Sequence, residues 1–501
     1  MIYLKRVVII GAGIVGASIA RVLSKYNNLE VILIEKNVDV GRGVSKANTG
    51  LIHAGYDDDP DKYPMRASLV VKGNNLWQRW VKELYIPNNW PGDLVVAFNE
   101  KEMNILRDLL RRGKRNGAVG LRIVDSDELQ ELEPMVNPDA VGALWAPSGG
   151  QVDPAHAVVA ICENAVANGV KLYLETEVLD VEVKDGAIVG IETNNGFVKA
   201  DILINAAGLY ADKISQMVGI EDVKIRPRKG EYIIFHKEIE EKVRRIIFPT
   251  PTEKTKGVVV TTEINGHLMI GPNAQDLPEE AKEDLSNTKE GLEFVWSWGE
   301  KLLKSMPPRS AIMKTFAGLR PEPEGGDFII RAYEDVYGFI NVAGIRSPGL
   351  TAAPAIAYMV RDLIERELGI TLFEKRGWKS TRGPPIFLSR LQWNDIKKLI
   401  KKDPRYGKIY CRCGVTSEAE ILDAIKRMKW IGVRKPNLES VKVRSNAMKG
   451  RCQGSFCSFK IAMLLAREYG VDVWKILLNE PGSEIAMGDI KMLLGGEKND
   501  L

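Results

Sequence analysis

Two close pairs of cysteines stand near the C-terminus of this 501-residue chain. Cys411 lies beside Cys413 and Cys452 beside Cys457, and the only other cysteine is Cys162. Thiolates are the ligands of iron–sulfur clusters and of structural zinc. Zinc sites usually place two residues between paired cysteines, so spacers of one and four residues favour a cluster, with zinc or metal-free thiols as the alternatives. A cluster would make this an electron-transferring protein.

A glycine-rich motif near the N-terminus could hold a dinucleotide. Gly11, Gly13 and Gly16 follow an apolar run at 7–10 and precede a helical pattern, and Glu35 ends the second apolar run. In such a βαβ unit the glycines let the backbone approach a pyrophosphate, the helix N-terminus attracts it, and the carboxylate holds a ribose hydroxyl. The motif predicts a Rossmann-like nucleotide-binding domain.

Three later segments contain the small residues of a backbone that could line a ring system. They span 42–55, 201–208 and 344–351. The last one ends a predicted strand and begins a helix, whose amides and dipole would stabilise negative charge on a reduced flavin. These segments favour a flavin over a nicotinamide.

Taken in this order, the segments resemble the FAD-dependent glycine/D-amino-acid oxidase superfamily. Within it the chain resembles the FAD-dependent glycerol-3-phosphate dehydrogenases, especially the A subunit of the anaerobic enzyme, from Gly11 to about residue 470. The cysteine segments resemble the bacterioferritin-associated ferredoxin module, which binds a [2Fe-2S] cluster. The resemblance implies an α/β fold: a Rossmann-like FAD-binding domain with an inserted antiparallel β substrate domain, and a small helical C-terminal iron–sulfur domain.

The resemblance also implies cofactor positions, residue by residue. Val178 matches a strand position whose backbone holds the adenine edge, although an apolar strand residue is also ordinary core. The four paired cysteines match the cluster ligands. The other FAD positions are Gly11, Gly13, Gly16 and Glu35 in the fingerprint, Arg42, Ser45 and Thr49 in the following loop, Ala207 and Gly208 after a later strand, and Gly349, Leu350 and Thr351 at the pyrimidine end of the flavin.

Oxidation of an anionic secondary alcohol requires a base for the hydroxyl proton and cations for the substrate. His53 is the predicted base, with a structural or flavin-orienting role as the alternative. Arg320, in the motif at 318–321, resembles the family's substrate-contacting arginine; a structural salt bridge is its alternative. Arg346 supplies a second cation, in a loop that differs from the Gly-Gly-Lys form of the aerobic glycerol-3-phosphate enzymes.

Glu231 and Tyr232 are the remaining candidates for the reaction site. They begin a predicted strand of the substrate domain, in a segment that resembles one in hydroxyglutarate dehydrogenases. Their candidate role is to assist proton transfer. Ordinary cross-strand contacts are the alternative.

The resemblance implies a dehydrogenase that oxidises sn-glycerol 3-phosphate to dihydroxyacetone phosphate by hydride transfer to flavin. Electrons would leave through [2Fe-2S] to partner subunits, a second flavoprotein and a small iron–sulfur protein, and not to oxygen. One alternative on the same scaffold is a dehydrogenase for 2-hydroxyglutarate or for an amino or imino acid. The other is a non-catalytic electron-transfer subunit.

The length predicts two or three domains. We expect the FAD-dependent oxidoreductase at 1–375, a basic linker at 376–408, the [2Fe-2S] domain at 409–480 and a tail at 481–501. Predicted strands lie at 172–183, 187–193, 197–205, 231–236, 257–263, 267–271 and 339–343, and predicted helices at 352–368, 417–428 and 459–469.

Charge is distributed unevenly along the chain. Residues 1–375 carry 45 Lys and Arg against 53 Asp and Glu, a net −8, whereas 376–501 carry 25 against 13, a net +12. Within this part, 376–408 has ten basic and two acidic residues, which suits either a solvated connector or a face for an acidic partner or anionic membrane. Regular aromatic interleaving is absent, so no nucleic-acid partner is expected. No apolar run suits a spanning helix or signal peptide, so we expect a cytoplasmic protein, and peripheral membrane contact is left open as an option.

Overall fold

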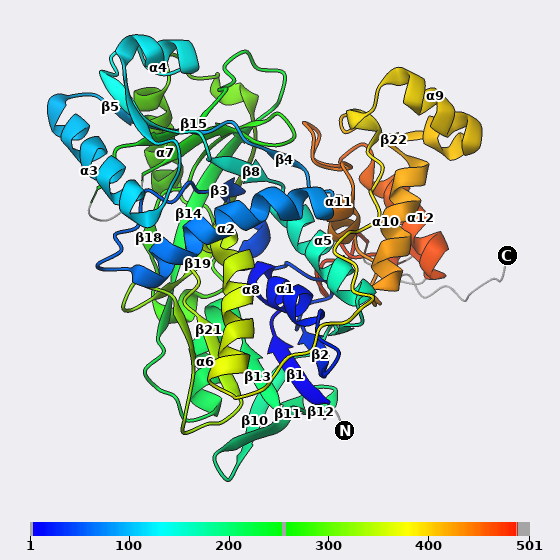
Figure 1. Ribbon diagram of the computed structural model, residues 1–501. Helices are drawn as coiled ribbons and strands as arrows, with labels where there is room; N and C mark the ends of the chain where they lie inside the picture. Colours follow the sequence, from blue (N-terminus) through cyan, green and yellow to red (C-terminus); the bar gives the residue numbers. More distant parts are fainter. Residues whose placement is uncertain (1–3, 253–256, 487, 489–501) are drawn as a thin grey trace. The chain divides into compact units, whose positions relative to one another are not determined.

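The structure is a computed structural model that describes residues 4–252, 257–486 and 488. The chain forms two compact units (Figure 1). The first contains Met1–Lys36 and Val40–Gly383, and the second contains Asn37–Asp39 and Pro384–Leu501. The predicted basic linker is therefore divided between the units at residue 383. Of the predicted tail, only 481–486 and 488 belong to the described residues.

The predicted nucleotide-binding sheet has six strands. Five run parallel, and β20 lies antiparallel at one edge. Strands β1 and β2 are nearly continuous apolar runs because a parallel sheet is covered on both faces. In spatial order the strands are β20 (Ile329–Ala332), β21 (Phe339–Ala343), β13 (Ile202–Asn205), β1 (Lys5–Ile10), β2 (Leu29–Ile34) and β9 (Lys171–Tyr173).

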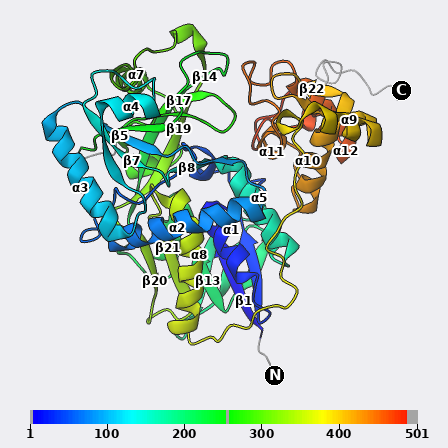
Figure 2. The same ribbon diagram turned by 45° about the horizontal axis from the view of Figure 1, so that its top comes forward.

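Different elements cover the two faces of this sheet. Helices α1 (Ile14–Leu23) and α8 (Gly349–Arg366) lie against one face, and α5 (Pro154–Ala167) packs beside α1 (Figures 1 and 2). On the other face, side chains of β1, β2 and β13 share an apolar cluster with a three-stranded antiparallel sheet and with α6 (Ala211–Met217). That small sheet consists of β10 (Val178–Lys184), β11 (Ala187–Thr193) and β12 (Gly196–Lys199).

A larger sheet forms the predicted substrate domain. Alternate residues of β5 enter two different cores: Leu94 and Val96 face α7 (Lys289–Leu302), whereas Val95 and Ala97 face α3 (Glu100–Asn116). Its strands are β18 (Gln275–Asp276), β14 (Ile225–Phe235), β17 (Leu268–Gly271), β16 (Val259–Thr262), β15 (Ile246–Pro249), β5 (Asp93–Ala97), β7 (Gly142–Ala146) and β6 (Arg122–Asp125), with β19 (Ile312–Pro323) paired to β14.

The predicted α/β fold with an inserted β substrate domain is confirmed, but this sheet is mixed and not purely antiparallel. Strands β5 and β15 run parallel. They come from stretches of chain separated by the nucleotide-binding domain, so no hairpin dictates their relative direction. The remaining elements are the short strands β3 (Leu51–Ile52), β8 (Gly150–Val152) and β4 (Asn88–Asn89), and helices α2 (Pro64–Glu83) and α4 (Ser126–Leu132).

Two strands predicted as continuous are divided. The stretch at 197–205 forms β12 in the small sheet and β13 in the parallel sheet. The chain changes sheets at 200–201, where the Ala200 amide donates to Val189 O and the Asp201 amide donates to Arg6 O, both at 2.9 Å. The stretch at 172–183 is divided likewise into β9 and β10. Apolar periodicity cannot reveal such a change, because both strands are extended.

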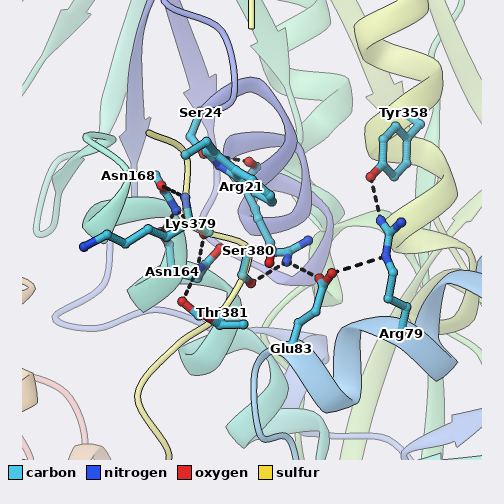
Figure 3. A network of polar contacts seen from close by, with 11 residues as sticks. Arg21, Ser24, Arg79, Glu83, Asn164, Asn168, Tyr358, Lys379, Ser380 and Thr381 are labelled. Atoms are coloured by element: carbon cyan, nitrogen blue, oxygen red, sulfur yellow. Dashed lines mark hydrogen bonds and ion pairs between the residues drawn. The ribbon is translucent and has the colours of Figure 1, made fainter. Parts of the chain in front are cut away.

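The first eight residues of the predicted linker, 376–383, are held against the helices of the first unit (Figure 3). Arg21, in α1, donates from Nη2 to Ser380 O at 3.0 Å. Asn164, in α5, donates from Nδ2 to the carbonyls of Lys379 and Thr381 at 3.1 and 3.2 Å. Side chains of α1 and α5 therefore fix this part of the linker by donating hydrogen bonds to its backbone carbonyls.

The second unit is mostly helical. Its predicted helices are confirmed as α10 (Glu418–Trp430) and α12 (Ser458–Tyr469), and it adds α9 (Trp393–Lys402), α11 (Leu438–Arg444) and the short strands β22 (Ile409–Cys411) and β23 (Thr416–Ser417). Ser417 and Glu420 form a reciprocal capping box at the start of α10. The side chains of Asp39 and Arg444 form a fully buried ion pair at 2.5 Å. Across both units, none of the described helices is long and apolar enough to cross a membrane.

Candidate active site

The carboxyl ends of β1 and β13 meet at the predicted pyrophosphate position. Gly11 has φ +98°, and a Cβ there would lie 2.5 Å from Ala206 O. A Cβ on Gly16 would lie 2.0 Å from Gly11 O. Ala207 and Gly208 follow directly, at the start of a short 3-10 turn. The two predicted FAD contacts are therefore brought together, in a cradle that only glycine permits at residues 11 and 16.

Side chains from two other segments fix the N-terminus of α1. Glu35 Oε2 accepts a hydrogen bond from the Ala12 amide at 2.9 Å. Ser45 Oγ accepts one from the Ile14 amide at 2.9 Å, in place of the side-chain cap that Gly13 lacks. The positive end of the helix dipole is thus held beside the carboxylate that is predicted to bind the ribose.

The other predicted cofactor residues occupy the surrounding loops. Arg42 and Thr49 flank the Ser45 turn and are both half-buried. Asn48 Nδ2 donates to Val44 O and Ser45 O at 3.0 Å and fixes this turn. Val178 opens β10 and packs against the apolar cluster under the parallel sheet, which is the core role considered as its alternative.

The start of α8 is attached to α2 and β3. Gly349 is its first residue, Leu350 O accepts from Trp77 Nε1 at 3.0 Å, and Thr351 Oγ1 accepts from the His53 amide at 3.0 Å. The Thr351 hydroxyl also donates to Leu51 O at 3.3 Å. The predicted pyrimidine-end segment and the predicted base are therefore neighbours, through a contact that no local pattern in the sequence indicates.

His53 is buried, with 8% of its surface exposed. Its Nδ1 lies 3.6 Å from Asp57 Oδ2, and its ring centroid lies 6.0 Å from that of Phe248. A carboxylate beside one ring nitrogen can fix the orientation of an imidazole. Asp57 was not predicted, although its position four residues after the candidate base was available in the sequence.

Arg320 is held by backbone carbonyls. Its Nη2 donates to Asn273 O at 2.8 Å and to Lys229 O at 3.2 Å, and its Nε donates to Arg228 O at 3.4 Å. Burial lowers the pKa of this guanidinium. Among the described residues it forms no salt bridge, so backbone carbonyls, and not a carboxylate, hold this side chain.

Arg346 lies in the loop between β21 and α8 and pairs with Glu322 through Nη1. Burial lowers the pKa of Arg346 to about 10, so the group is still a cation at neutral pH. Within the described part of the chain, Arg346 Nε and Glu322 Oε2 are buried without a hydrogen-bond partner. Such atoms are costly to leave unpaired, and a bound polar ligand would satisfy them.

Two further arginines, neither of them predicted, complete a cluster around Arg346. Arg66, in α2, and Arg228, in β14, both lie close enough to lower its pKa, as Arg320 does. Arg228 Nη1 lies 3.4 Å from Glu322 Oε1. We call Arg66, Arg228, Arg320 and Arg346 the arginine cluster. Guanidinium groups are the side chains that best match anions with several oxygens, but in this cluster Arg66 already pairs with Asp58 and Arg228 with Asp276.

Glu231 and Tyr232 lie on opposite faces of β14. Arg228, Gly230 and Tyr232 alternate on the face of Arg320, so Glu231 points away from the arginine cluster. The Glu231 carboxylate accepts hydrogen bonds from Asn273 Nδ2 at 2.6 Å and from the Thr288 hydroxyl at the start of α7. The structure therefore brings Tyr232, and not Glu231, to the side of Arg320.

Tyr232 stacks on Phe316 of β19, with ring centroids 4.4 Å apart. Burial raises the pKa of Tyr232 to about 12. Its phenol is therefore neutral at neutral pH. On the same face, a Cβ on Gly318 would lie 2.1 Å from Ala47 O, so the substrate sheet lies directly on the Ser45 loop.

The four cysteines of the second unit form two spatial pairs. Cys413 Sγ lies 4.0 Å from Cys452 Sγ, and Cys457 donates a hydrogen bond to Cys411, which lowers the pKa of Cys411 to about 6. Amides of 454 and 456 donate to Cys452 and lower its pKa. No group of three or more His, Cys, Asp or Glu among the described residues is arranged to hold a metal ion.

Comparisons with known proteins agree with this geometry. The family model described as FAD dependent oxidoreductase matches residues 6–363. The glycerol 3-phosphate dehydrogenase of Caloramator mitchellensis is 42% identical over 97% of this chain and 98% of its own length. The L-2-hydroxyglutarate dehydrogenase of Indibacter alkaliphilus is 35% identical over 54% of this chain and 67% of its own length.

A solved structure shares the fold of most of the chain. The L-alpha-glycerophosphate oxidase of Mycoplasma pneumoniae, with FAD bound, is 31% identical with a TM-score of 0.71. The match covers 76% of this chain and 99% of the oxidase. About a quarter of this chain therefore has no counterpart there, and the family match ends at residue 363, before Pro384–Leu501, the larger part of the second unit.

Proposed function

Because the chain belongs to the FAD dependent oxidoreductase family, we propose that it oxidises glycerol 3-phosphate to dihydroxyacetone phosphate. The observation that best supports this substrate is the arginine cluster. Among the described residues, Arg320 has no carboxylate partner there and the Nε of Arg346 has no hydrogen-bond partner. A phosphate offers three oxygens to such a cluster, more than a carboxylate does.

FAD fits the residues around α1. The backbone cradle at Gly11 and Gly16 leaves room for a pyrophosphate, Glu35 suits the ribose, and the α8 start suits the pyrimidine end of the flavin. The cofactor supplies the acceptor for the hydride that leaves the substrate carbon. The contacts of Arg42, Thr49 and Val178 with FAD are part of this proposal.

The chain's own residues bind the substrate and remove its proton. Arg320 and Arg346 hold the phosphate and thereby orient the carbon that bears the hydroxyl. His53 accepts the hydroxyl proton, and Asp57, 3.6 Å from Nδ1, stabilises the imidazolium that forms. One proton and one hydride leave the alcohol, which balances its oxidation to the ketone.

The second unit is proposed to bind a [2Fe-2S] cluster through Cys411, Cys413, Cys452 and Cys457. Two thiolates on one tetrahedral metal lie about 3.8 Å apart when the metal–sulfur bonds are about 2.3 Å. The 4.0 Å between Cys413 Sγ and Cys452 Sγ is close to that separation. Backbone amides directed at Cys452 suit a cluster thiolate.

A cluster held by these four cysteines would give the electrons an exit to an acceptor other than oxygen. The dehydrogenase relative spans 97% of this chain, whereas the oxidase structure matches only 76% of it. The proposed acceptors are partner subunits, a second flavoprotein and a small iron–sulfur protein. A cytoplasmic location stays a prediction from the sequence.

Anaerobic titration of the FAD-loaded protein with sn-glycerol 3-phosphate tests the substrate. We expect the visible absorption of the flavin to bleach, and to stay unchanged with 2-hydroxyglutarate or proline. Bleaching by 2-hydroxyglutarate alone would support the hydroxy-acid alternative. No bleaching by any of the three would leave the electron-transfer subunit as the better explanation.

Iron and acid-labile sulfide analysis tests the cluster. We expect two irons and two sulfides for each chain, and their loss in Cys413→Ser. The matched control is Cys162→Ser, because Cys162 is buried in α5 of the first unit. Finding zinc without sulfide would mean that the four cysteines form a structural zinc site and not an iron–sulfur cluster.

A further inference from the structure

Helix α9 is amphipathic, yet none of its ten residues is buried. Trp393 is 62% exposed, and Ile396, Leu399 and Ile400 are only half-buried. Ile400 lies near Gly407, in the short turn that follows the helix. A ten-residue helix is marginal in water without an apolar face packed against a partner. This helix therefore has a face that its own unit does not cover.

Lysines border this apolar face. Trp393, Ile396 and Ile400 follow the helical spacing of one stripe. Lys397 and Lys401 lie directly beside this stripe, whereas Lys398, which pairs with Asp395 at 3.0 Å, and Lys402 lie on the opposite, polar face. All four lysines are exposed. The Lys397 ammonium lies 5.5 Å from the Trp393 ring centroid, so cation and indole occupy the same edge. Residues 390–408 hold seven basic and two acidic residues, a net +5.

The chemistry of this face suits a lipid surface better than a protein. Protein interfaces are enriched in aromatic residues and arginine but depleted in lysine, so the four lysines and not Trp393 distinguish the two kinds of partner. Membrane-surface helices instead combine lysines on the polar face with tryptophan and aliphatic residues on the other. Long lysine side chains can also extend to the headgroups while their stems cover apolar surface.

We propose that α9 binds the surface of a bilayer containing anionic phospholipid. Its lysines meet the lipid phosphates, and Trp393 enters the headgroup boundary. This inference does not depend on the substrate or the cluster, because it concerns only the charge and exposure of one helix.

Co-sedimentation of the full-length, FAD-loaded protein with vesicles tests the proposal. We expect binding to vesicles of phosphatidylcholine and phosphatidylglycerol in equal parts, and none to pure phosphatidylcholine. Each lysine near an anionic surface contributes about a fivefold change in affinity, so changing all four α9 lysines to Gln should lower it at least about a hundredfold. About 1 M salt, with a Debye length of about 3 Å, should release the wild-type protein.

A matched variant separates the position of the charges from their number. Lys101, Lys114, Lys199 and Lys224 are exposed lysines of the first unit, and changing them to Gln removes the same net charge. We expect this variant to bind anionic vesicles as the wild type does. Equal loss in both variants, or no binding of the wild type at low salt, would overturn the proposal.

Trp393→Ala distinguishes a bilayer from an acidic protein partner. Trp393→Ala removes the indole that would be buried in the lipid headgroup boundary, and this loss should weaken vesicle binding about tenfold. The same change should leave binding to polyglutamate, which has no apolar layer, within about twofold. If Trp393→Ala does not affect the vesicles, or if polyglutamate binds more tightly than they do, the helix is a site for an acidic protein. Thermal unfolding of each variant verifies that the fold is retained.

Discussion

Arg320 is preorganised for its proposed role. Three backbone carbonyls hold two of its nitrogens, so the side chain is fixed before an anion arrives. Removal of one hydrogen-bonding cation from a charged ligand costs about 1.5–3 kcal/mol. We therefore expect Arg320→Ala to raise KM for glycerol 3-phosphate about ten- to a hundredfold.

Steady-state kinetics at saturating acceptor measures this change. Arg320→Lys, which keeps the charge but loses the planar fork, should fall between the wild type and Arg320→Ala. Arg309→Ala is the control, because Arg309 is exposed and pairs with Glu293 on α7. A KM within twofold of the wild type for Arg320→Ala would count against the substrate contact.

His53 can be tested independently of cofactor binding. Its side chain faces Asp57, whereas its amide, which survives substitution, bonds Thr351. We expect His53→Asn to lower kcat about 10²- to 10⁴-fold and to leave the FAD content unchanged. His236→Asn, beside Glu238 at 3.3 Å, should have little effect. If His53→Asn instead releases FAD at full kcat, the flavin-orienting alternative is the better one.

Asp93, in the substrate sheet, should make the stability of the fold depend on pH. Burial raises its pKa well above the usual range. Between the unfolded value of about 4 and this higher folded value, the folded chain keeps a proton that the unfolded chain has lost. Its contribution to stability is therefore full below about pH 4 and is lost as pH rises through the folded pKa. Asp93→Asn should flatten this decline and raise the unfolding temperature at pH 8 more than at pH 5.

Thermal unfolding at the two pH values measures the effect. Asp139→Asn is the control, because Asp139 is exposed. An equal shift at both pH values in Asp93→Asn would mean that the carboxyl is not protonated in the fold.

At the scale of elements, the junction of β1 and α1 allows a matched pair of substitutions. A Cβ on Gly16 would lie 2.0 Å from Gly11 O, whereas a Cβ on Gly43 would meet nothing within 4 Å. Overpacking of this kind forces backbone shifts that cost about 1–3 kcal/mol. We expect Gly16→Ala to weaken FAD retention about tenfold or more, measured by flavin fluorescence after dialysis. Gly43→Ala should retain FAD as the wild type does.

The elements that carry local signals were predictable from the sequence. The βαβ opening, the strands at 231–236, 267–271 and 339–343, and the helices of the second unit follow from apolar runs, glycines and caps. The division at 200–201 was not, because both halves are extended. The parallel pairing of β5 with β15 depends on contacts far apart in the chain.

The site was predictable only in part, for the same reason. Motifs identified Gly11, Glu35 and Arg320, whose neighbours in sequence carry the signal. Arg66 comes from α2 and Arg228 from β14, and they meet only because tertiary packing brings these elements together. The position of Glu231 away from the cluster depends on strand register, which the sequence leaves open.

At the scale of the whole molecule, the second unit depends on a buried ion pair. The Asp39 and Arg444 side chains are fully buried, 2.5 Å apart. Loss of one partner leaves an uncompensated charge, at a cost of about 3–5 kcal/mol. We expect Arg444→Leu to make the second unit susceptible to proteolysis while the first stays resistant. Arg467→Leu is the control, because Arg467 is 61% exposed, and equal resistance of both variants would contradict this prediction.

Asn37–Asp39 belongs to the second unit, although these residues are synthesised early, among the N-terminal residues of the first unit. Asp39 leaves the ribosome 405 residues before Arg444. At about 5–20 residues per second, its carboxylate remains hydrated for roughly 20 to 80 s before its partner is made. The second unit is therefore completed only when translation is nearly finished. A gene truncated to encode Pro384–Leu501 alone would omit one of the unit's own parts.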